Sequence, residues 1–433
     1  MPPAGLGIGP SGSVLCRLMW AGLVRLRPPG GPGTLEVRRC TASTGGFPIK
    51  AGAFLRGTMM NGQIRWVSCL AMVAAVLLPT ARAADPEEPL APDLKRSLVV
   101  SGQGYFPVAL RLKDGRIAVV LRGGAEHLGI KGRLDIVFSA DEGATWTKPA
   151  VVVDSPLDDR NPAFGQAADG TLVVGFYRTA QYDDRGRYDP RLPKPITTWV
   201  TRSQDGGRTW EDPRPIDVSD ISWGSPYGKI LTMPDGSLWM AIYGGPIRRP
   251  GDPLNLTTGP NRSYLYRSMD HGRTWSRHAG PIGGEGRQFN ETALVRLPSG
   301  KLLAAMRARS AEIWLSESAD DGRTWSQPQQ LTPPQVHPAD LLLLPDGRVL
   351  LVTGYRVGPF GVRGLVSDRQ SRFDWSRRFV LVNDASSPDC GYPSSVLLSE
   401  NRVLTLYYAV RSRDNPQWKV HCGAVLYRVP DDK

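Results

Sequence analysis

The chain has 433 residues, of which 41% are hydrophobic and 22% charged, an ordinary globular balance with enough length for a large core. Its formal charge of +12 would favour nucleic-acid binding if it were spread over a folded surface. Nine basic residues and one acid lie in residues 1–83, however, and the remainder holds 44 basic and 40 acidic residues. Nothing there forms a dense basic stripe, so we exclude nucleic acid as a partner.

The first recognisable segment has the three parts of a secretory signal peptide. A basic residue, Arg65, is followed by an apolar run over 66–79 and by an A-x-A spacing that ends at Ala83. The apolar part is too short for a stable bilayer anchor. Residues 59–83 are therefore predicted to be a signal peptide.

Translation is expected to start at Met59 or Met60, because the preceding residues are rich in Gly, Pro and Arg and lack a hydrophobic period. Residues 1–58 are then an untranslated or a disordered extension. Residues 84–433 form the mature domain, without a membrane span, and are exported to a periplasm or to the outside of the cell.

Two cysteines, Cys390 and Cys422, remain after the leader. An exported chain with two cysteines can pair them. Two buried thiols explain the same residues equally well, and the sequence leaves both alternatives open.

Two interleaved repeats organise residues 96–430. An eight-residue phrase with the pattern S-x-D-x-G-x-T-W begins at residues 139, 203, 268 and 318, and an eroded copy spans 367–375. Short apolar runs flank tight turns, several with Asp-Gly, at 112–117, 167–172, 233–238, 297–302, 344–349 and 398–403. Asp-Gly between apolar runs is a strong hairpin signal, because the turn needs positive φ.

Each unit is therefore expected to be a four-stranded antiparallel meander of about 50 residues, the size of one propeller blade. Six units predict an all-β, six-bladed β-propeller. A ring of blades buries sheet faces that a single blade leaves exposed. We expect a strand near residues 98–100 to close the ring by pairing with 423–429, and we disfavour a β-sandwich.

The aspartates of the repeated phrase are expected to be structural. Asp and Ser or Thr side chains hydrogen-bond the backbone of their own turn, Gly supplies the unusual backbone angle, and Trp fills the gap between strands. Asp-box (BNR) repeats of this form on a six-bladed propeller resemble those of the sialidase (neuraminidase) superfamily. The likeness covers nearly all of residues 96–430.

The strand order predicts which face carries chemistry. The hairpin turns and the Asp boxes both lie on one face of an antiparallel meander, so a central site on the other face must draw on the remaining connections. Those connections are crowded with arginine, carboxylate and tyrosine side chains. Residues 290–307 (NETALVRLPSGKLLAAMR) form one hairpin whose ends bring Glu291 and Arg307 side by side.

The resemblance implies roles for several of these residues. Residues 290–307 are similar to the sialidase segment that carries the glutamate supporting the nucleophile, here Glu291, and the second substrate-binding arginine, here Arg307. Residues 391–408 resemble the segment that begins with the catalytic tyrosine, here Tyr392. Arg363 has the spacing of the third arginine, with Arg356 as its competitor.

These residue types suit an acidic sugar. Arginine forks bind a carboxylate through paired, charge-assisted hydrogen bonds. The carboxylate of sialic acid would repel a carboxylate nucleophile, whereas a tyrosine is neutral until it reacts. Glu291 would take the phenolic proton as the bond forms.

Two positions depart from the family pattern. Tyr105 occupies the place of the first triad arginine, and Arg122 or Arg160 would supply the missing charge. The acid/base aspartate expected in the first-blade loop is absent. Its candidate replacements are Glu126, His127, Asp158 and Asp159, and Glu126 is the one we assign to catalysis, with Asp159 near the substrate.

Three functions fit the sequence. In order of preference they are a divergent exo-sialidase, a hydrolase of another acidic sugar, and a non-catalytic propeller that binds glycans or proteins. The five histidines show no metal-ligand spacing and no phosphate-binding loop opens a helix, so no metal or cofactor is expected. The expected partner is a sialylated or other acidic glycan.

Overall fold

The computed structural model describes residues 88–245 and 260–431. Near the start of the chain it adds only four short strands, β1 (Leu15–Cys16), β2 (Val24–Arg25), β3 (Gly57–Met60) and β4 (Gln63–Trp66). The chain divides into two units, Met1–Ala84 and Asp85–Lys433. Most of the predicted signal peptide falls outside the described residues.

The second unit is all-β, as predicted, apart from one 3-10 turn, η1 (Trp375–Arg377). Its strands follow one another in groups of four, and each group is an antiparallel meander. The first two groups are β6 (Tyr105–Arg111), β7 (Ile117–Gly123), β8 (Arg133–Ser139) and β9 (Ala150–Val153), then β10 (Asp158–Gln166), β11 (Leu172–Thr179), β12 (Ile196–Ser203) and β13 (Arg214–Pro215). The next two are β14 (Gly224–Thr232), β15 (Leu238–Gly244), β16 (Arg262–Ser268) and β17 (Ser276–Ala279), then β18 (Phe289–Arg296), β19 (Leu302–Ala308), β20 (Ile313–Ser318) and β21 (Gln329–Gln330). The last are β22 (Val336–Leu343), β23 (Val349–Tyr355), β24 (Gly361–Val366) and β25 (Phe379–Val382), then β26 (Cys390–Leu397), β27 (Arg402–Val410) and β28 (Val420–Arg428), completed by β5 (Lys95–Ser101).

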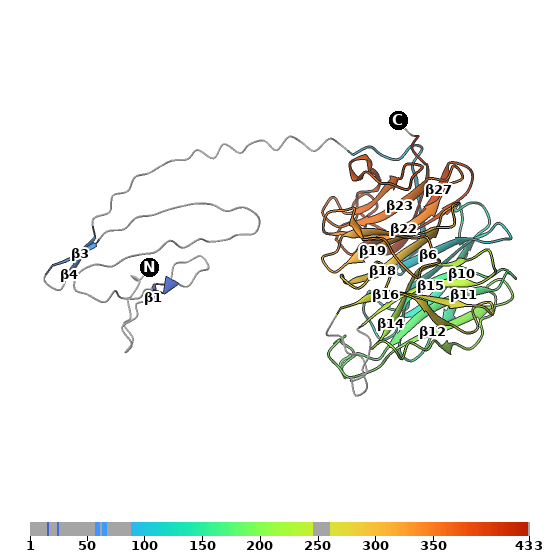
Figure 1. The fold of residues 1–433 in the computed structure, drawn as a ribbon, viewed down its shortest axis with the longest axis horizontal. Helices are drawn as coiled ribbons and strands as arrows, with labels where there is room; N and C mark the ends of the chain where they lie inside the picture. Colours follow the sequence, from blue (N-terminus) through green and yellow to red (C-terminus); the bar gives the residue numbers. More distant parts are fainter. Residues whose placement is uncertain are drawn as a thin grey trace. The chain divides into compact units, whose positions relative to one another are not determined.

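The sheets form a propeller-like arrangement (Figure 1). Four of them have four strands, and β10–β17 form one eight-stranded sheet because β10 pairs with β14 in parallel at two positions. The first strands of successive groups contact one another in the order β6, β10, β14, β18, β22 and β26, and β26 contacts β6 again. The inner strands therefore run around a closed circle.

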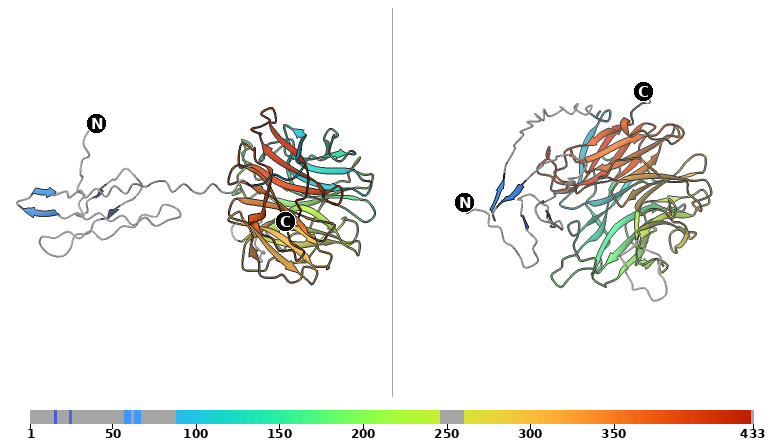
Figure 2. Two further views of the ribbon diagram at one scale, coloured as in Figure 1. Left: turned by 90° about the horizontal axis from the view of Figure 1, so that it is seen from above. Right: turned by 60° about the vertical axis from the view of Figure 1, so that its left-hand side comes forward.

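The predicted closing strand is confirmed. β5 pairs antiparallel with β28, with Leu98 opposite Gly423 and Val100 opposite Cys422. Figure 2 shows the blue start of this unit beside the red strands of its end. The first and last strands of the unit thus share a sheet, and opening the ring would cost both this pairing and the packing of the neighbouring sheets.

The core lies between sheets that face each other. Ile117, Val119 and Leu121 of β7 pack with Leu404 and Leu406 of β27, so the first and last sheets share one apolar cluster. Because each sheet is covered on both faces, strands such as β7 read as nearly continuous apolar runs instead of alternating ones. Burial of these faces supplies the main driving force for closing the circle.

The two cysteines are both free and buried. Cys390 lies opposite Ala409 of β27 and Cys422 lies opposite Tyr408, so β27 separates the strands that carry them. Of the two alternatives the sequence left open, the structure has the buried thiols.

The repeated phrase is a structural turn, as predicted. In the third copy Asp270 accepts hydrogen bonds from the amide of Thr274 at 2.8 Å and from its hydroxyl at 2.6 Å, while the amide of Gly272 donates to the Ser268 hydroxyl at 2.9 Å. Gly272 has a φ of 83°, and a Cβ there would approach Val173 of the preceding group of strands to 2.7 Å. Each box therefore holds its own turn together and seats it tightly against its neighbour.

We expect Gly272→Ala to destabilise the protein more than Gly170→Ala, measured by urea unfolding. Both positions have positive φ, which costs an alanine about 1–2 kcal/mol. Only Gly272 adds a clash with the neighbouring strands, worth about 1–3 kcal/mol more, because nothing lies within 4 Å of a Cβ at Gly170. Equal losses in free energy of unfolding would contradict a role of the box in joining neighbouring blades.

Candidate active site

A β-bulge near the start of each inner strand builds the site. Pairing with the second strand shifts register at Tyr105/Val108, Arg160/Ala163, Tyr227/Leu231, Asn290/Ala293, Val336/Ala339 and Gly391/Ser394. At four of these bulges a non-glycine residue has positive φ: Phe106, Asn161, Glu291 and Tyr392. A bulge bends its strand and redirects a side chain, and such strained backbone occurs often at functional sites.

Glu291 stands at the centre of this group. Its Oε1 accepts a hydrogen bond from the Tyr392 hydroxyl, and its Oε2 lies 2.6 Å from Nη1 of Arg307. Glu291 is 3% and Tyr392 8% exposed. Burial and the charge of Glu291 raise the pKa of Tyr392 well above its ordinary value of 10.0, so the resting phenol is protonated. The structure thus brings together a neutral phenol, a carboxylate positioned to take its proton, and a cation that holds the carboxylate.

Arg356 lies beside this trio, 5.6 Å from the centre of the Tyr392 ring. Its Nε donates to the carbonyl oxygen of Cys390 at 3.1 Å, but its buried Nη2 has no partner among the described residues. The Nε of Arg307 is also buried without one. Buried donors without partners are costly, which indicates that a bound anion would complete this part of the site.

His337, between these arginines, stays neutral. It is 2% exposed, and burial together with the charges of Arg307 and Arg356 lowers its pKa to about 2. His337 therefore adds no positive charge beside the guanidinium groups of Arg307 and Arg356.

Arg363, the residue predicted to be the third arginine, is bound by protein partners away from Tyr392. It lies on β24, the third strand of its sheet, and is 1% exposed. Its Nε donates to Glu88 and its Nη1 donates to the carbonyl oxygen of Val382 at 2.8 Å. Arg363 fastens the segment around Glu88 to this sheet, and Arg356 is the arginine that reaches Tyr392.

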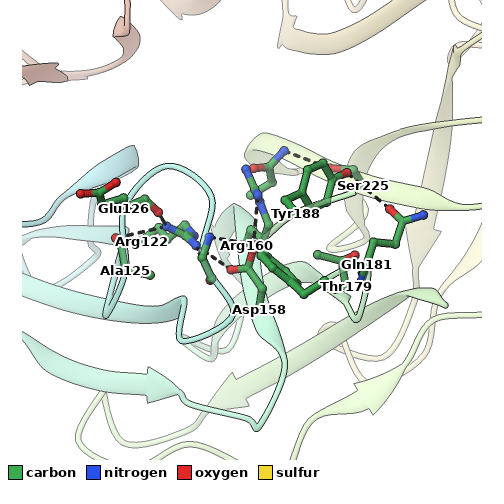
Figure 3. Close-up of polar contacts among 12 residues, drawn as sticks. Arg122, Ala125, Glu126, Asp158, Arg160, Thr179, Gln181, Tyr188 and Ser225 are labelled. Atoms are coloured by element: carbon green, nitrogen blue, oxygen red, sulfur yellow. Dashed lines mark hydrogen bonds and ion pairs between the residues drawn. The ribbon is translucent and has the colours of Figure 1, made fainter. Parts of the chain in front are cut away.

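Arg122 and Asp158 form a fully buried ion pair of 2.7 Å (Figure 3). Arg122 also donates to the carbonyl oxygens of Ala125, Glu126 and Gly129. Arg122 therefore clamps the loop after β7 and has several protein acceptors already, so it does not replace the missing triad arginine.

Arg160 is better placed than Arg122 to supply the positive charge of the missing first triad arginine. It contacts Asp158 at 3.3 Å, and its guanidinium carbon lies 5.9 Å from the Phe106 ring, which itself packs 4.8 Å from the Tyr392 ring. Its buried Nε has no partner among the described residues. Asp159, by contrast, is fully buried against Arg178 at 2.8 Å and the amide of Ser155 at 2.7 Å, which leaves it no role at the pocket.

The loop that Arg122 clamps carries Glu126 and His127. The Glu126 side chain is exposed, and Figure 3 shows its carboxylate on the far side of Arg122 from Asp158. His127 instead packs its ring 5.0 Å from Phe106 and pairs through Nδ1 with Asp389 at 2.9 Å. No sequence pattern singled out Asp389, although its place three residues before Tyr392 put it on the right face.

Tyr105, the residue at the place of the first arginine, belongs to an aromatic wall. Its ring lies 5.1 Å from Tyr408 and 5.8 Å from His127. An apolar ring therefore fills the space where the family pattern has a cation.

Among residues 88–245 and 260–431, no three His, Cys, Asp or Glu side chains gather as metal ligands would. The same residues contain no helix with the length and apolarity needed to cross a bilayer.

The fold and this constellation define a class, the sialidase/BNR-repeat superfamily. A family model described as the BNR repeat-like domain matches residues 122–404, more than half of the chain, so the chain belongs to that family.

Curated relatives of the chain include two that are named as sialidases. An exo-alpha-sialidase of Aspergillus fumigatus is 28% identical over 225 residues, which cover 46% of this chain and 50% of that protein. A sialidase of Bacteroides fragilis is 24% identical over 257 residues, which cover 56% of this chain and 38% of that protein. The match thus extends over half or less of each relative's length.

Solved structures share the fold. A protein of unknown function from Dyadobacter fermentans has a TM-score of 0.66 and 24% identity, with 78% of this chain and all of that chain covered. The NanB sialidase of Streptococcus pneumoniae, as its K499G mutant, has a TM-score of 0.58 and 14% identity, with 77% and 70% covered.

We expect His337 to make the protein less stable in acid. Its folded pKa is below the unfolded value of 6.5, so below about pH 6.5 the unfolded state binds a proton that the folded state does not. Relative to His337→Gln, the native protein should lose about 1.4 kcal/mol of unfolding free energy per pH unit as pH falls from about 6 to about 4. Urea unfolding of both proteins measures this, and a difference independent of pH would contradict the burial of a neutral imidazole.

Proposed function

We propose that this protein is an exo-α-sialidase-like glycoside hydrolase that removes a terminal sialic acid or related acidic sugar from glycoconjugates by a retaining mechanism. The observation that carries the proposal is the contact of Tyr392 with Glu291 and of Glu291 with Arg307 on one face of the closed circle of strands. The curated relatives named as sialidases support it.

The proposal includes the architecture and the location. We take the eight-stranded sheet as two blades joined by the short parallel pairing of β10 with β14, which makes six blades in all. We also propose export, as the segment over 59–83 predicts, because the glycan chains of glycoconjugates are found mainly outside the cytoplasm.

The unpartnered guanidinium groups explain how the sugar is recognised. Arg307 and Arg356 would bind the substrate carboxylate, and Arg160 would add positive potential from the neighbouring strand. The substrate carboxylate would repel a carboxylate nucleophile. It does not repel Tyr392, because the raised pKa of this phenol keeps it protonated and neutral.

The reaction divides into two displacements. Tyr392 Oη bonds to the anomeric carbon as its proton passes to Glu291 and the bond to the leaving oxygen breaks, with an acid protonating that oxygen. Water then attacks the same carbon and gives its proton to the conjugate base of that acid. The bond from the carbon to Tyr392 Oη breaks, and the proton on Glu291 returns to the phenolate. Arg307 holds the Glu291 carboxylate aimed at Tyr392 in the resting state.

Tyr105 favours a second candidate, a hydrolase for another acidic sugar such as a uronate or a different 2-keto acid. The aromatic wall of Tyr105, Phe106 and Tyr408 places aromatic surface where the first triad arginine would bind the carboxylate. A sugar with a differently placed carboxylate would fit this changed pocket.

We expect Tyr392→Phe to lower kcat for 4-nitrophenyl α-sialoside by at least about 10³-fold, because the nucleophile is lost. Glu291→Gln should lower it by about 10²–10⁴-fold, because the proton acceptor is lost. Tyr427→Phe is the matched control, since Tyr427 is also buried but bonds Thr405 away from the site.

Release of 4-nitrophenol by each purified protein measures these effects. Undiminished turnover by Tyr392→Phe would refute the proposed nucleophile. If the native protein hydrolyses a 4-nitrophenyl glycuronide and not the sialoside, the second candidate is correct.

We expect Arg356→Ala to lower kcat/KM for the sialoside about 10- to 100-fold, the loss typical of a hydrogen bond between charged groups. The native protein should also prefer the sialoside to its carboxyl methyl ester, and Arg356→Ala should lose most of that preference. Arg323→Ala, an exposed arginine in an Asp box, serves as control. An unchanged preference in Arg356→Ala would show that this arginine does not face the carboxylate.

A further inference from the structure

His127 and Asp389 form a pair with the arrangement of a supported imidazole. Nδ1 of His127 lies 2.9 Å from Oδ1 of Asp389, and the Tyr408 hydroxyl donates to the same oxygen at 2.5 Å. In the part of the chain that the structure describes, no residue hydrogen-bonds the opposite ring nitrogen, Nε2. Asp389 thus orients the ring through Nδ1 and leaves Nε2 available to a substrate, as a carboxylate does for the histidine of a catalytic triad.

The pair lies beside the nucleophile. The Phe106 ring is 5.0 Å from the His127 ring and 4.8 Å from the Tyr392 ring, so one phenyl group contacts both. Tyr408 makes a second link, because its ring packs 5.7 Å from Tyr392 and its hydroxyl bonds Asp389. A sugar bound against Phe106 would therefore have Tyr392 and His127 near the same glycosidic bond.

An open groove of about 590 Å³ begins at His127. Tyr105, Leu128 and Asp389 line it near the imidazole, and Arg411 and Lys419 line it further along. Its volume has room for the leaving part of a glycoconjugate beside His127.

We propose that His127 is the general acid of this enzyme and that Asp389 positions it, an inference that rests on the proposed glycosidase function. Protonated Nε2 gives its proton to the glycosidic oxygen while the bond from that oxygen to the anomeric carbon breaks and Tyr392 bonds to the carbon. Neutral His127 then takes a proton from the water that displaces Tyr392, and Glu291 returns its proton to the phenolate.

The loop contacts agree with this assignment. Arg122, which is paired with Asp158, donates to the carbonyl oxygens of Glu126 and Gly129, and these bonds fix the backbone that carries His127. Glu126, the acid predicted from the sequence, has an exposed side chain and no comparable support.

The exchange of arginine for Tyr105 fits the same chemistry. An imidazole must be cationic before it donates its proton, and a guanidinium at the distance of the Tyr105 ring, 5.8 Å, would oppose that charge. The side chains near His127 are the carboxylates of Asp389 and Glu126 and the neutral rings of Tyr105, Phe106 and Tyr408, and Arg411 and Lys419 line the same groove. Arg122 donates to the carbonyl oxygen of Glu126, but its charge is paired with Asp158.

The test compares substrates whose leaving groups differ in their need for an acid. Sialyllactose leaves as a sugar alkoxide and needs a proton, whereas 4-nitrophenolate leaves without one. We expect His127→Gln to lower kcat/KM for sialyllactose about 10²–10⁴-fold and that for 4-nitrophenyl α-sialoside less than about 10-fold. Asp389→Asn should show the same selectivity to a smaller degree, a pattern that a merely structural role would not produce.

His271→Gln is the matched control, because His271 also pairs with an aspartate, Asp169 at 3.4 Å, but lies in an Asp box. Equal losses on both substrates in both His127→Gln and Asp389→Asn, or the selective loss in Glu126→Gln, would overturn the assignment. If Tyr392→Phe is inactive while His127→Gln is fully active on both substrates, the proposed function stands and this inference fails. If the native protein cleaves no acidic glycoside, both fail.

Discussion

The site depends on one buried carboxylate with two partners. Glu291 is 3% exposed and has the Tyr392 hydroxyl on one oxygen and Arg307 on the other. A buried carboxylate without partners would be costly, so these contacts must form for the inner strands to pack as they do. Arg307 comes from the same hairpin as Glu291, but Tyr392 lies about 100 residues later in the chain. Closing the circle of strands is therefore what completes the trio.

The opposite ends of the strands divide two tasks. At one end the Asp boxes satisfy their own backbone and pack against the neighbouring strands, as Gly272 does against Val173. At the other end the bulges accept positive φ at residues such as Glu291 and Tyr392 and turn their side chains toward one another. Strain on the site face is tolerated because the surrounding sheets are firmly held.

The arginines near the site fall into two groups according to their partners. Arg122 and Arg363 each have carboxylate and carbonyl acceptors and serve the fold. Arg307 and Arg356 are only half-buried and lie beside Glu291 and Tyr392, and Arg356 keeps its terminal Nη2 without a partner among the described residues. Because these two arginines lie beside Tyr392 and can still bind an acceptor, we propose that they bind the substrate carboxylate.

The sequence by itself determined the features that depend on local patterns. Hairpin turns, Asp boxes, the closing strand and the hairpin that joins Glu291 to Arg307 follow from turn chemistry and from the two-residue period of strands. The role of Tyr392 as the nucleophile was predicted from the resemblance of residues 391–408 to a sialidase segment. The tertiary structure alone decided which of Arg356 and Arg363 reaches the pocket, that Arg122 and Asp159 are bound by protein partners, and that Asp389 supports His127. The physical reason is that the sequence does not show whether an arginine or a carboxylate faces a substrate or a buried counter-charge. The partner of such a side chain comes from another strand, which lies near only when the circle of strands has closed.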